Sequence, residues 1–113
     1  MSIIMASEID APLPQRLVDD LGKVSDLTSS VLEDALKSLT KVDGTVANAS
    51  IKSAQRIEKD AESVMDKLFD FRLNQKTVVA VRLALESLKR ISEYGEDVAE
   101  MTINLTARRR ELY

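Results

Sequence analysis

The segment from residue 82 to residue 105 constrains the fold most, because it is long, contains no proline and repeats apolar residues at steps of three and four. The apolar positions are Leu85, Leu88, Ile91, Val98, Met101 and Leu105, with Gly95 between them. At about 100° per residue they fall on one side of a helix, roughly opposite the acidic residues. The acidic positions are Glu86, Glu93, Asp97 and Glu100. The pattern predicts an amphipathic helix with one apolar face for packing and one acidic face toward solvent.

Two similar stripes precede this segment, and together the three predict three long helices. The first stripe comprises Leu17, Leu21, Val24, Val31, Ala35, Leu39 and Val42, and the second comprises Ala47, Ile51, Ala54, Ile57, Ala61, Val64, Leu68 and Phe71. Pro14 suits the first turn of the first helix. Asp43 and Gly44 are expected to end that helix, since glycine readily adopts the left-handed conformation of a C-terminal cap. Asn74 is the expected N-cap of the third helix, which is expected to run to near residue 108.

The fold class that follows is all-α, an antiparallel up-down-up bundle of three long helices. No alternating run of apolar and polar residues is long enough for a strand. The 113 residues, 44% of them hydrophobic, suffice for one domain over residues 14–110, preceded by a flexible N-terminal segment at residues 1–13. Alanine, serine and threonine within the stripes predict closely spaced helices. Phe69 and Phe71 are expected to close one end of the core.

The composition argues against several functional classes. A net charge of -3 and a pI near 5.0 disfavour a nucleic-acid binder, which needs a concentrated basic surface. The sequence has no histidine and no cysteine, so it lacks the usual general base, thiolate metal ligands and disulfides. Neither a secretory signal nor a membrane span is visible, which predicts a cytoplasmic protein without membrane insertion. No catalytic residue and no required cofactor is predicted.

Carboxylates spaced by four form the only constellation that could carry chemistry. On the second helix they are Glu58, Glu62, Asp66 and Asp70, and on the third they are Glu93 with Asp97 and Glu96 with Glu100. Like charges at this spacing destabilise a helix by roughly a few tenths of a kcal/mol per pair, and a bound cation would reverse that cost. Oxygen ligands favour Mg²⁺, Ca²⁺, Mn²⁺ or iron. One hypothesis is therefore a surface metal site formed by Glu62, Asp66, Glu93 and Asp97.

The alternative is a solvated acidic face that local ion pairs neutralise. The candidate pairs are Asp19 with Lys23, Glu33 with Lys37 and Glu86 with Arg90, all at the spacing of neighbours on a helix. Both interpretations place the acids on the outside of the bundle, because the helical period puts them away from the apolar stripes.

Two windows of the sequence resemble the PhoU domain family. The run LKRISEYGEDVAE is similar to the family's terminal-helix signature at Leu88, Arg90, Ile91, Ala99 and Glu100. An upstream window is similar to its second-helix pattern at Glu62, Met65, Asp66, Lys67, Leu68 and Phe69. At the level of helix pattern the resemblance covers residues 17–106. It implies a three-helix fold and a non-catalytic negative regulator of phosphate uptake that acts by contact with a transporter or sensor kinase.

The resemblance also bears on metal binding and on assembly. In some PhoU domains an acid-x-x-x-aspartate motif binds surface metal clusters, and Glu62 with Asp66 fits that motif. On the third helix Lys89 stands where the family has an acid and Glu93 replaces the aspartate, so an ammonium group would compete with a cation. PhoU proteins commonly contain two three-helix repeats, whereas this sequence contains one. A homodimer is expected to cover the apolar surface that the second repeat would cover.

Other functions stay open at this point. The chain could be a regulatory module of another ion-transport system, a generic helical adaptor, or a fragment or module that docks onto another protein. A small all-α enzyme such as a chorismate mutase would need basic residues inside a cavity. The candidates Arg56, Arg82, Lys89 and Arg90 mostly fall beside or opposite the apolar stripes, which disfavours that class.

Overall fold

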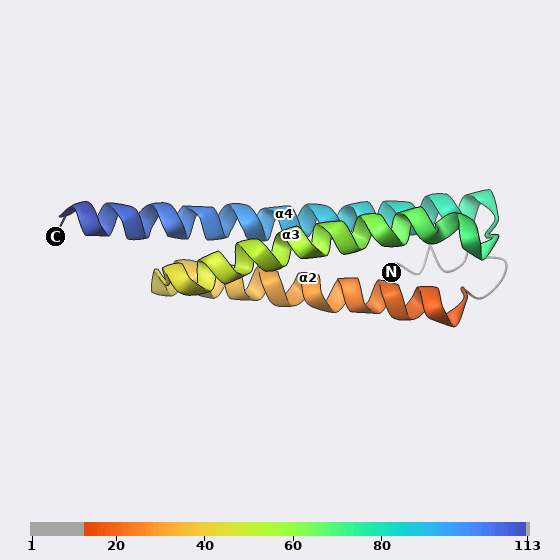
Figure 1. The fold of residues 1–113 in the computed structure, drawn as a ribbon, viewed down its shortest axis with the longest axis horizontal. Helices are drawn as coiled ribbons and strands as arrows, with labels where there is room; N and C mark the ends of the chain where they lie inside the picture. Colours follow the sequence, from red (N-terminus) through yellow and green to blue (C-terminus); the bar gives the residue numbers. More distant parts are fainter. Residues whose placement is uncertain (1–12, 113) are drawn as a thin grey trace.

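The computed structural model describes the backbone of residues 13–112 and the side chains of residues 13–109. These residues form helices α2 (Gln15–Lys41), α3 (Gly44–Lys67) and α4 (Gln75–Leu112), with a short 3₁₀ helix, η1 (Leu68–Phe71), after α3. Figure 1 shows α3 running opposite to α2 and α4, in an elongated bundle whose extents are 61 × 25 × 18 Å. The predicted all-α, up-down-up three-helix bundle is therefore confirmed. Residues 1–12, most of the segment predicted to be flexible, lie outside the described residues.

Each helix points a residue at the bundle axis after alternating steps of three and four. The inward residues of α2 run Leu17, Leu21, Val24, Thr28, Val31, Ala35 and Ser38, and those of α3 run Ala47, Ser50, Ala54, Ile57, Ala61 and Val64. An average step of 3.5 residues is the repeat of left-handed coiled coils, in which side chains interdigitate along one seam. The apolar stripes predicted for the first two helices lie along these seams except at Leu39 and Ile51, where the buried residues are the preceding Ser38 and Ser50.

The stripe predicted for the third helix is wrong in its second half. Met101 and Leu105 are 54% and 41% exposed, whereas Ser92, Ala99 and Thr102 are buried. The alternating step continues past Leu85 through positions where the sequence has small residues. Buried hydroxyl groups are tolerated there because each bonds to a nearby oxygen: the Ser92 hydroxyl donates to the Ala54 carbonyl over 3.1 Å.

The turn between α2 and α3 differs from the prediction in its capping residue. Val42, with φ of 50°, takes the left-handed conformation, and Gly44 is the first residue of α3. Asp43 caps α3 by accepting hydrogen bonds from the backbone N–H groups of Thr45 and Val46. Glycine is favoured at position 44 for a different reason: a Cβ there would lie 3.3 Å from Cγ2 of Thr106 on α4, which is closer than ordinary contact. The glycine therefore permits close approach of two helices.

The turn between α3 and α4 confirms Asn74 as a cap, since its side chain accepts from the Thr77 N–H over 2.8 Å. The prediction for the two phenylalanines is only half correct. Leu68 takes the buried position at the start of η1, so the next residue, Phe69, points outward and is 78% exposed. Phe71 is half-buried and packs against the core. Helix α4 continues beyond the predicted end near residue 108 to Leu112.

The size of the buried side chains changes along the bundle. The part near the α3–α4 turn, called here the wide half, contains Leu17, Val24, Val31, Ile57, Val64, Leu68, Val81 and Leu85. The part near the α2–α3 turn, the narrow half, contains Ala35, Ala47 and Ala99 together with the buried hydroxyls of Ser38 and Thr102. Those two hydroxyls lie 3.1 Å apart and link α2 to α4. Small side chains permit close helix approach in this half, where a Cβ on Gly95 of α4 would lie 3.6 Å from the backbone of Leu32 on α2.

Candidate functional site

The four residues predicted as metal ligands are all exposed. Glu62 and Asp66 lie on α3, and Glu93 and Asp97 lie on α4. Of these, Glu62 and Glu93 lie on the face that α3 and α4 share, where both carboxylates act electrostatically on Lys89 of α4. The structure therefore brings one residue from each predicted pair to the same lysine.

The contact between Glu62 and Lys89 is the shortest ion pair among the described residues. The Lys89 Nζ atom donates to Glu62 Oε1 over 2.7 Å. The hydrogen bond and the positive charge lower the pKa of Glu62, and the same bond with the negative charge raises the pKa of Lys89. The ammonium group thus neutralises the carboxylate that fits the expected metal motif.

A second carboxylate cluster lies beside this pair. Glu58 on α3 faces Glu96 on α4, and the Gln55 amide donates to Glu96 Oε1 over 3.2 Å. Partial burial raises the pKa of Glu58 first, and then the charge of Glu96, proton sharing with that carboxylate, and the charge of Glu93 raise it further. Its Oε1 atom is enclosed and accepts no hydrogen bond from the described residues. Burial and the neighbouring carboxylates therefore favour the protonated form of Glu58 more than water does.

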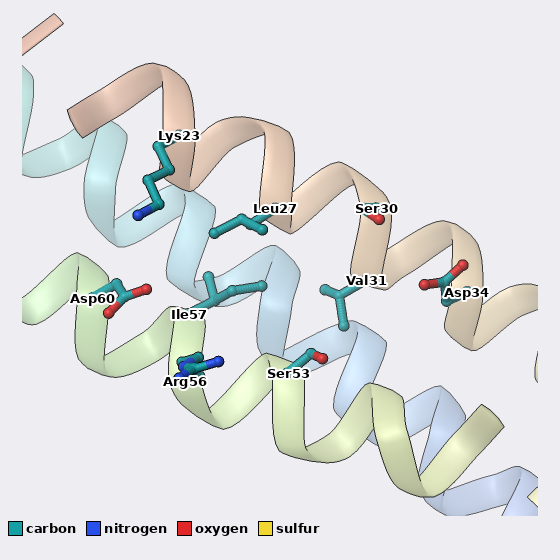
Figure 2. Close-up of a pocket in the computed structure, with 9 residues that line it drawn as sticks. All are labelled: Lys23, Leu27, Ser30, Val31, Asp34, Ser53, Arg56, Ile57 and Asp60. Atoms are coloured by element: carbon teal, nitrogen blue, oxygen red, sulfur yellow. The ribbon is translucent and has the colours of Figure 1, made fainter. Parts of the chain in front are cut away.

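The opposite side of α3 borders an open groove against α2, with a volume of about 570 Å³. Figure 2 shows Leu27, Val31 and Ile57 along its floor, with Lys23 and Asp60 toward one end and Asp34 toward the other. The remaining lining residues are Ser30, Ser53 and Arg56. The groove carries both signs of charge around an apolar floor, a combination that suits a peptide or helix surface better than a small anion.

Comparison with known families decides the classification. The model of the PhoU domain matches residues 21–102, which is most of the chain. The chain belongs to the PhoU domain family. No curated protein and no solved structure matches it. The match includes both windows that resembled the family, and it lies within the predicted range of 17–106.

In this PhoU domain the geometry around Lys89 bears on metal binding. Within residues 13–109, no group of three acidic side chains lies close enough to hold a metal ion. Lys89, at the position where the resemblance leads one to expect an acid, bonds to Glu62. Metal binding by Glu62, Asp66, Glu93 and Asp97 stays a prediction.

The predicted local ion pairs fare unevenly in this PhoU domain. Glu33 and Lys37 pair at 3.2 Å, as predicted. Glu86 pairs with Arg82 at 3.7 Å instead of with Arg90. Asp19 accepts a hydrogen bond from the side-chain amide of Gln15, one turn before it, in place of the predicted Lys23 contact. The acidic face is thus only partly neutralised by neighbours on the same helix.

The contacts that join α3 to α4 are not apparent from the residue pattern of either helix alone. Glu58 and Glu96 were recognised only as members of rows along single helices, and Lys89 was expected beside Glu93 and not bonded to Glu62. The alternation of three and four could have revealed these contacts, because Glu58 directly follows the inward Ile57 and Lys89 directly follows Leu88. Residues at such flanking positions of neighbouring helices face one another.

The mutase alternative finds no support in the interior of this PhoU domain. The buried polar residues among those described are Thr28, Ser38, Ser50, Thr77, Ser92 and Thr102. Arg56, Arg82 and Arg90 are exposed, so the basic side chains that would hold a dicarboxylate lie outside the bundle. Among the described residues, no helix is long and apolar enough to cross a membrane.

Proposed function

We propose that this PhoU-domain protein is a non-catalytic cytoplasmic regulator that lowers phosphate uptake by binding a phosphate transporter or its sensor kinase. The family match over residues 21–102 carries the proposal. The geometry is compatible with this proposal, because the charged side chains that could contact a partner lie on the surface. The buried polar side chains among the described residues are all serines and threonines. Long parallel and antiparallel helices offer extended surfaces for protein contact.

Two surfaces are suited to that contact. The groove between α2 and α3 combines an apolar floor with Lys23, Asp34 and Asp60. The α3–α4 face carries an excess of carboxylates and would attract a basic partner segment. The protein is proposed to act as a homodimer, which would present both surfaces twice and strengthen binding to a two-fold symmetric partner.

The proposal is tested by co-purification from the native cell together with an uptake measurement. Tagged protein should retain a phosphate permease or its kinase, and deletion of the gene should raise phosphate uptake in phosphate-rich medium. Retention of a different ion transporter would reassign the substrate, and unchanged phosphate uptake with no transport protein retained would overturn the regulatory proposal in favour of a generic adaptor.

Paired charge reversals then identify the docking surface. Lys23→Glu with Arg56→Glu alters the groove, and Glu93→Lys with Glu96→Lys alters the acidic face, so each variant is the control for the other. Loss of co-purification in one pair alone is expected. A complex that survives both reversals contradicts docking through either surface.

A metal-dependent variant of this function has its own test. We propose that a divalent cation or iron binds near Glu62, Asp66, Glu93 and Asp97 only weakly, because Lys89 already neutralises Glu62. Titration calorimetry with Mn²⁺, Mg²⁺ and ferric iron checks this, and Lys89→Gln should strengthen binding by freeing the carboxylate. Absence of heat above buffer in both proteins would remove the metal site.

A further inference from the structure

Helices α2 and α4 share a face that carries no charged residue, in a chain of which 31% is charged. Its residues are Val18, Gly22, Ser25, Ser29, Leu32, Leu36 and Leu39 on α2, and Ala80, Ala84, Ser87, Ile91, Tyr94, Val98, Met101 and Leu105 on α4. The backbone of Leu32 lies beside Gly95 of α4, whereas Leu27 and Asp34 point into the groove toward α3. Lys89 and Glu96 of α4 likewise face α3. The uncharged residues therefore occupy one continuous side of the bundle, called here the α2–α4 face.

Large apolar side chains on this face are substantially exposed. Leu36, Tyr94, Met101 and Leu105 are 48%, 57%, 54% and 41% exposed. Isolated exposed apolar residues are ordinary, but a continuous surface without a single charge that exposes several large apolar side chains is typical of a protein–protein contact.

Residue size divides the α2–α4 face into two halves. Small residues predominate in the half beside the wide part of the core, and large ones predominate in the other half. The small residues are Gly22, Ser25, Ser29, Ala80, Ala84 and Ser87; the large ones of the other half are Leu32, Leu36, Leu39, Ile91, Tyr94, Val98, Met101 and Leu105. The exceptions in the first half are Val18, 41% exposed, and Leu83, 57% exposed and five turns before Met101 on α4. The halves coincide on both helices because α2 and α4 run in the same direction, with Ser38 level with Thr102. The half with mostly small side chains is called here the low half, and the half with mostly large side chains is called the high half.

Gly22 supplies an independent reason to look for a partner. It lies inside α2, where glycine costs about 1 kcal/mol relative to alanine. Nothing in the described structure lies within 4 Å of the Cβ that an alanine would add, so no contact among residues 13–109 requires a glycine. A neighbouring molecule that approaches the helix closely would require one.

We infer that the α2–α4 face is the contact between two copies of this chain, packed antiparallel about a two-fold axis near Ser29 and Ser92. This arrangement sets the high half of each copy on the low half of the other. Leu105 then lies over the partner's Ala80, Met101 over the partner's Ala84, and Leu36 over the partner's Gly22. Parallel packing would instead set large residues against large ones and leave a gap along the small half.

The size of the face matches what such a dimer needs. At 1.5 Å per residue the uncharged stretches of α2 and α4 are about 32 and 38 Å long, and two helices side by side are about 20 Å wide. The face therefore covers roughly 700 Å² per copy, close to the value of about 800 Å² per partner in stable complexes.

Charges at the edges of the face are compatible with the same two-fold axis. On the outer edge of α4, Arg90 and Asp97 lie on either side of the axis, so each arginine would lie near the partner's Asp97. On the outer edge of α2, Asp26 would lie near the partner's Glu33, a like-charge contact that opposes association and that the pairing of each Glu33 with Lys37 in its own chain reduces. The apolar centre, and not the rim, therefore provides most of the stabilisation.

This inference rests on the homodimer within the proposed function and assigns its interface, independently of the transport system that is regulated. The first test compares Leu36→Glu with Leu27→Glu by sedimentation equilibrium. Both leucines lie on α2 with similar exposure, 48% and 38%, but Leu27 points into the α2–α3 groove. Leu36→Glu should weaken dimerisation at least about tenfold, since it buries a charge in the contact, while Leu27→Glu should leave it unchanged. Equal effects of the two variants would overturn the assigned face.

The second test uses disulfide trapping, which is clean because the sequence contains no cysteine. Ser29→Cys lies next to the proposed axis and should form a disulfide-linked dimer upon mild oxidation. Ser30→Cys, the next residue, lines the α2–α3 groove and should stay monomeric on a non-reducing gel. If the native chain sediments as a dimer but Ser29→Cys does not cross-link, the antiparallel interface is wrong and the homodimer stands. A monomeric native chain overturns both, and leaves the regulatory contact to the co-purification experiment.

Discussion

The wide and narrow halves of the bundle differ in the size of the side chains that they enclose. In the wide half, Leu17, Leu68 and Leu85 are fully enclosed between the three helices. In the narrow half the enclosed residues are Ala35, Ala47 and Ala99, and the leucines and Met101 lie on the α2–α4 face. The amphipathic pattern is continuous, but the large apolar side chains that the wide half encloses are replaced by alanines in the narrow half, whose large apolar side chains lie on the surface.

The two halves are therefore stabilised by different means. The wide half gains from removing large apolar surfaces from water, at about 25 cal/mol per Å². The narrow half has little apolar area to bury and depends on close helix approach and on hydroxyl hydrogen bonds such as that between Ser38 and Thr102. In the proposed dimer, a second copy would cover the large side chains that the narrow half keeps outside.

Truncation in the wide half should have the largest effect. Leu85 is 0% exposed, so Leu85→Ala removes buried methyl groups and leaves a cavity, which should lower the free energy of unfolding by about 2–5 kcal/mol. Urea denaturation at a fixed protein concentration measures it, with Leu83→Ala, which is 57% exposed in the native chain, as the matched control. A loss below about 1 kcal/mol would mean that the wide half is not tightly packed.

Enlargement in the narrow half should have the next largest effect. Ala99 is 0% exposed between closely spaced helices, so Ala99→Leu should lower the free energy of unfolding by about 1–3 kcal/mol through overpacking. The same denaturation experiment applies, and Ala107→Leu, at an exposed position of α4, is the control. A stabilised Ala99→Leu variant would show that the narrow half contains unfilled space, contrary to the comparison.

Sequence alone was sufficient for the parts of the fold set by apolar periodicity and capping. The stripes through Leu17 and Ile57 and the Asn74 cap follow from local chemistry that the chain displays directly. The stripe after Leu88 failed because large residues were preferred to small ones. Ser92 and Thr102 are buried only because other helices supply close contacts and hydrogen-bond partners, which a single helix does not reveal.

The candidate site was less accessible to sequence analysis for a similar reason. Rows of carboxylates along one helix are visible in the sequence, but the bond between Glu62 and Lys89 depends on the register of α3 against α4. The same register determines that Glu58 meets Glu96. The role of Gly44 also depends on another helix, because the glycine permits the close approach of Thr106 and does not form a left-handed turn.

Loss of the hydroxyl contact in the narrow half should have a smaller effect. Thr102→Val keeps the shape of the side chain but removes the oxygen that lies 3.1 Å from the Ser38 hydroxyl. Because Ser38 still donates to the Ala35 carbonyl, the expected loss is about 0.5–1.5 kcal/mol by thermal or urea denaturation. Thr106→Val, whose hydroxyl bonds only within α4, is the control and should change stability less. An unchanged Thr102→Val protein would show that packing alone holds this half together.

The smallest effect is expected on the charged α3–α4 face. The pKa of Glu58 is raised in the folded state above its ordinary 4.5, so the folded protein binds that proton more tightly than the unfolded chain. Its contribution to stability is therefore complete below pH 4.5 and declines as the pH rises through the raised value. Glu58→Gln should be more stable than the native chain at pH 7 by roughly 0.3 kcal/mol, a small figure because solvent screens these carboxylates.

The pH dependence distinguishes this cause from a general effect of mutation. The advantage of Glu58→Gln should disappear as the pH falls toward 4, where the native glutamate is protonated. Glu62→Gln is the opposite control: the Lys89 bond lowers the pKa of Glu62, so that residue stabilises the fold above pH 4.5 and loses its contribution as the pH falls. Parallel pH profiles for the two variants would contradict the assigned pKa shifts.

The central claim is that the chain forms a homodimer, because large apolar side chains lie exposed on its α2–α4 face. Sedimentation equilibrium of the unmodified chain across micromolar concentrations tests this claim most directly. The account predicts a mass twice the 12.6 kDa of one chain, falling toward the monomer value upon dilution. A mass of 12.6 kDa at every concentration would contradict it.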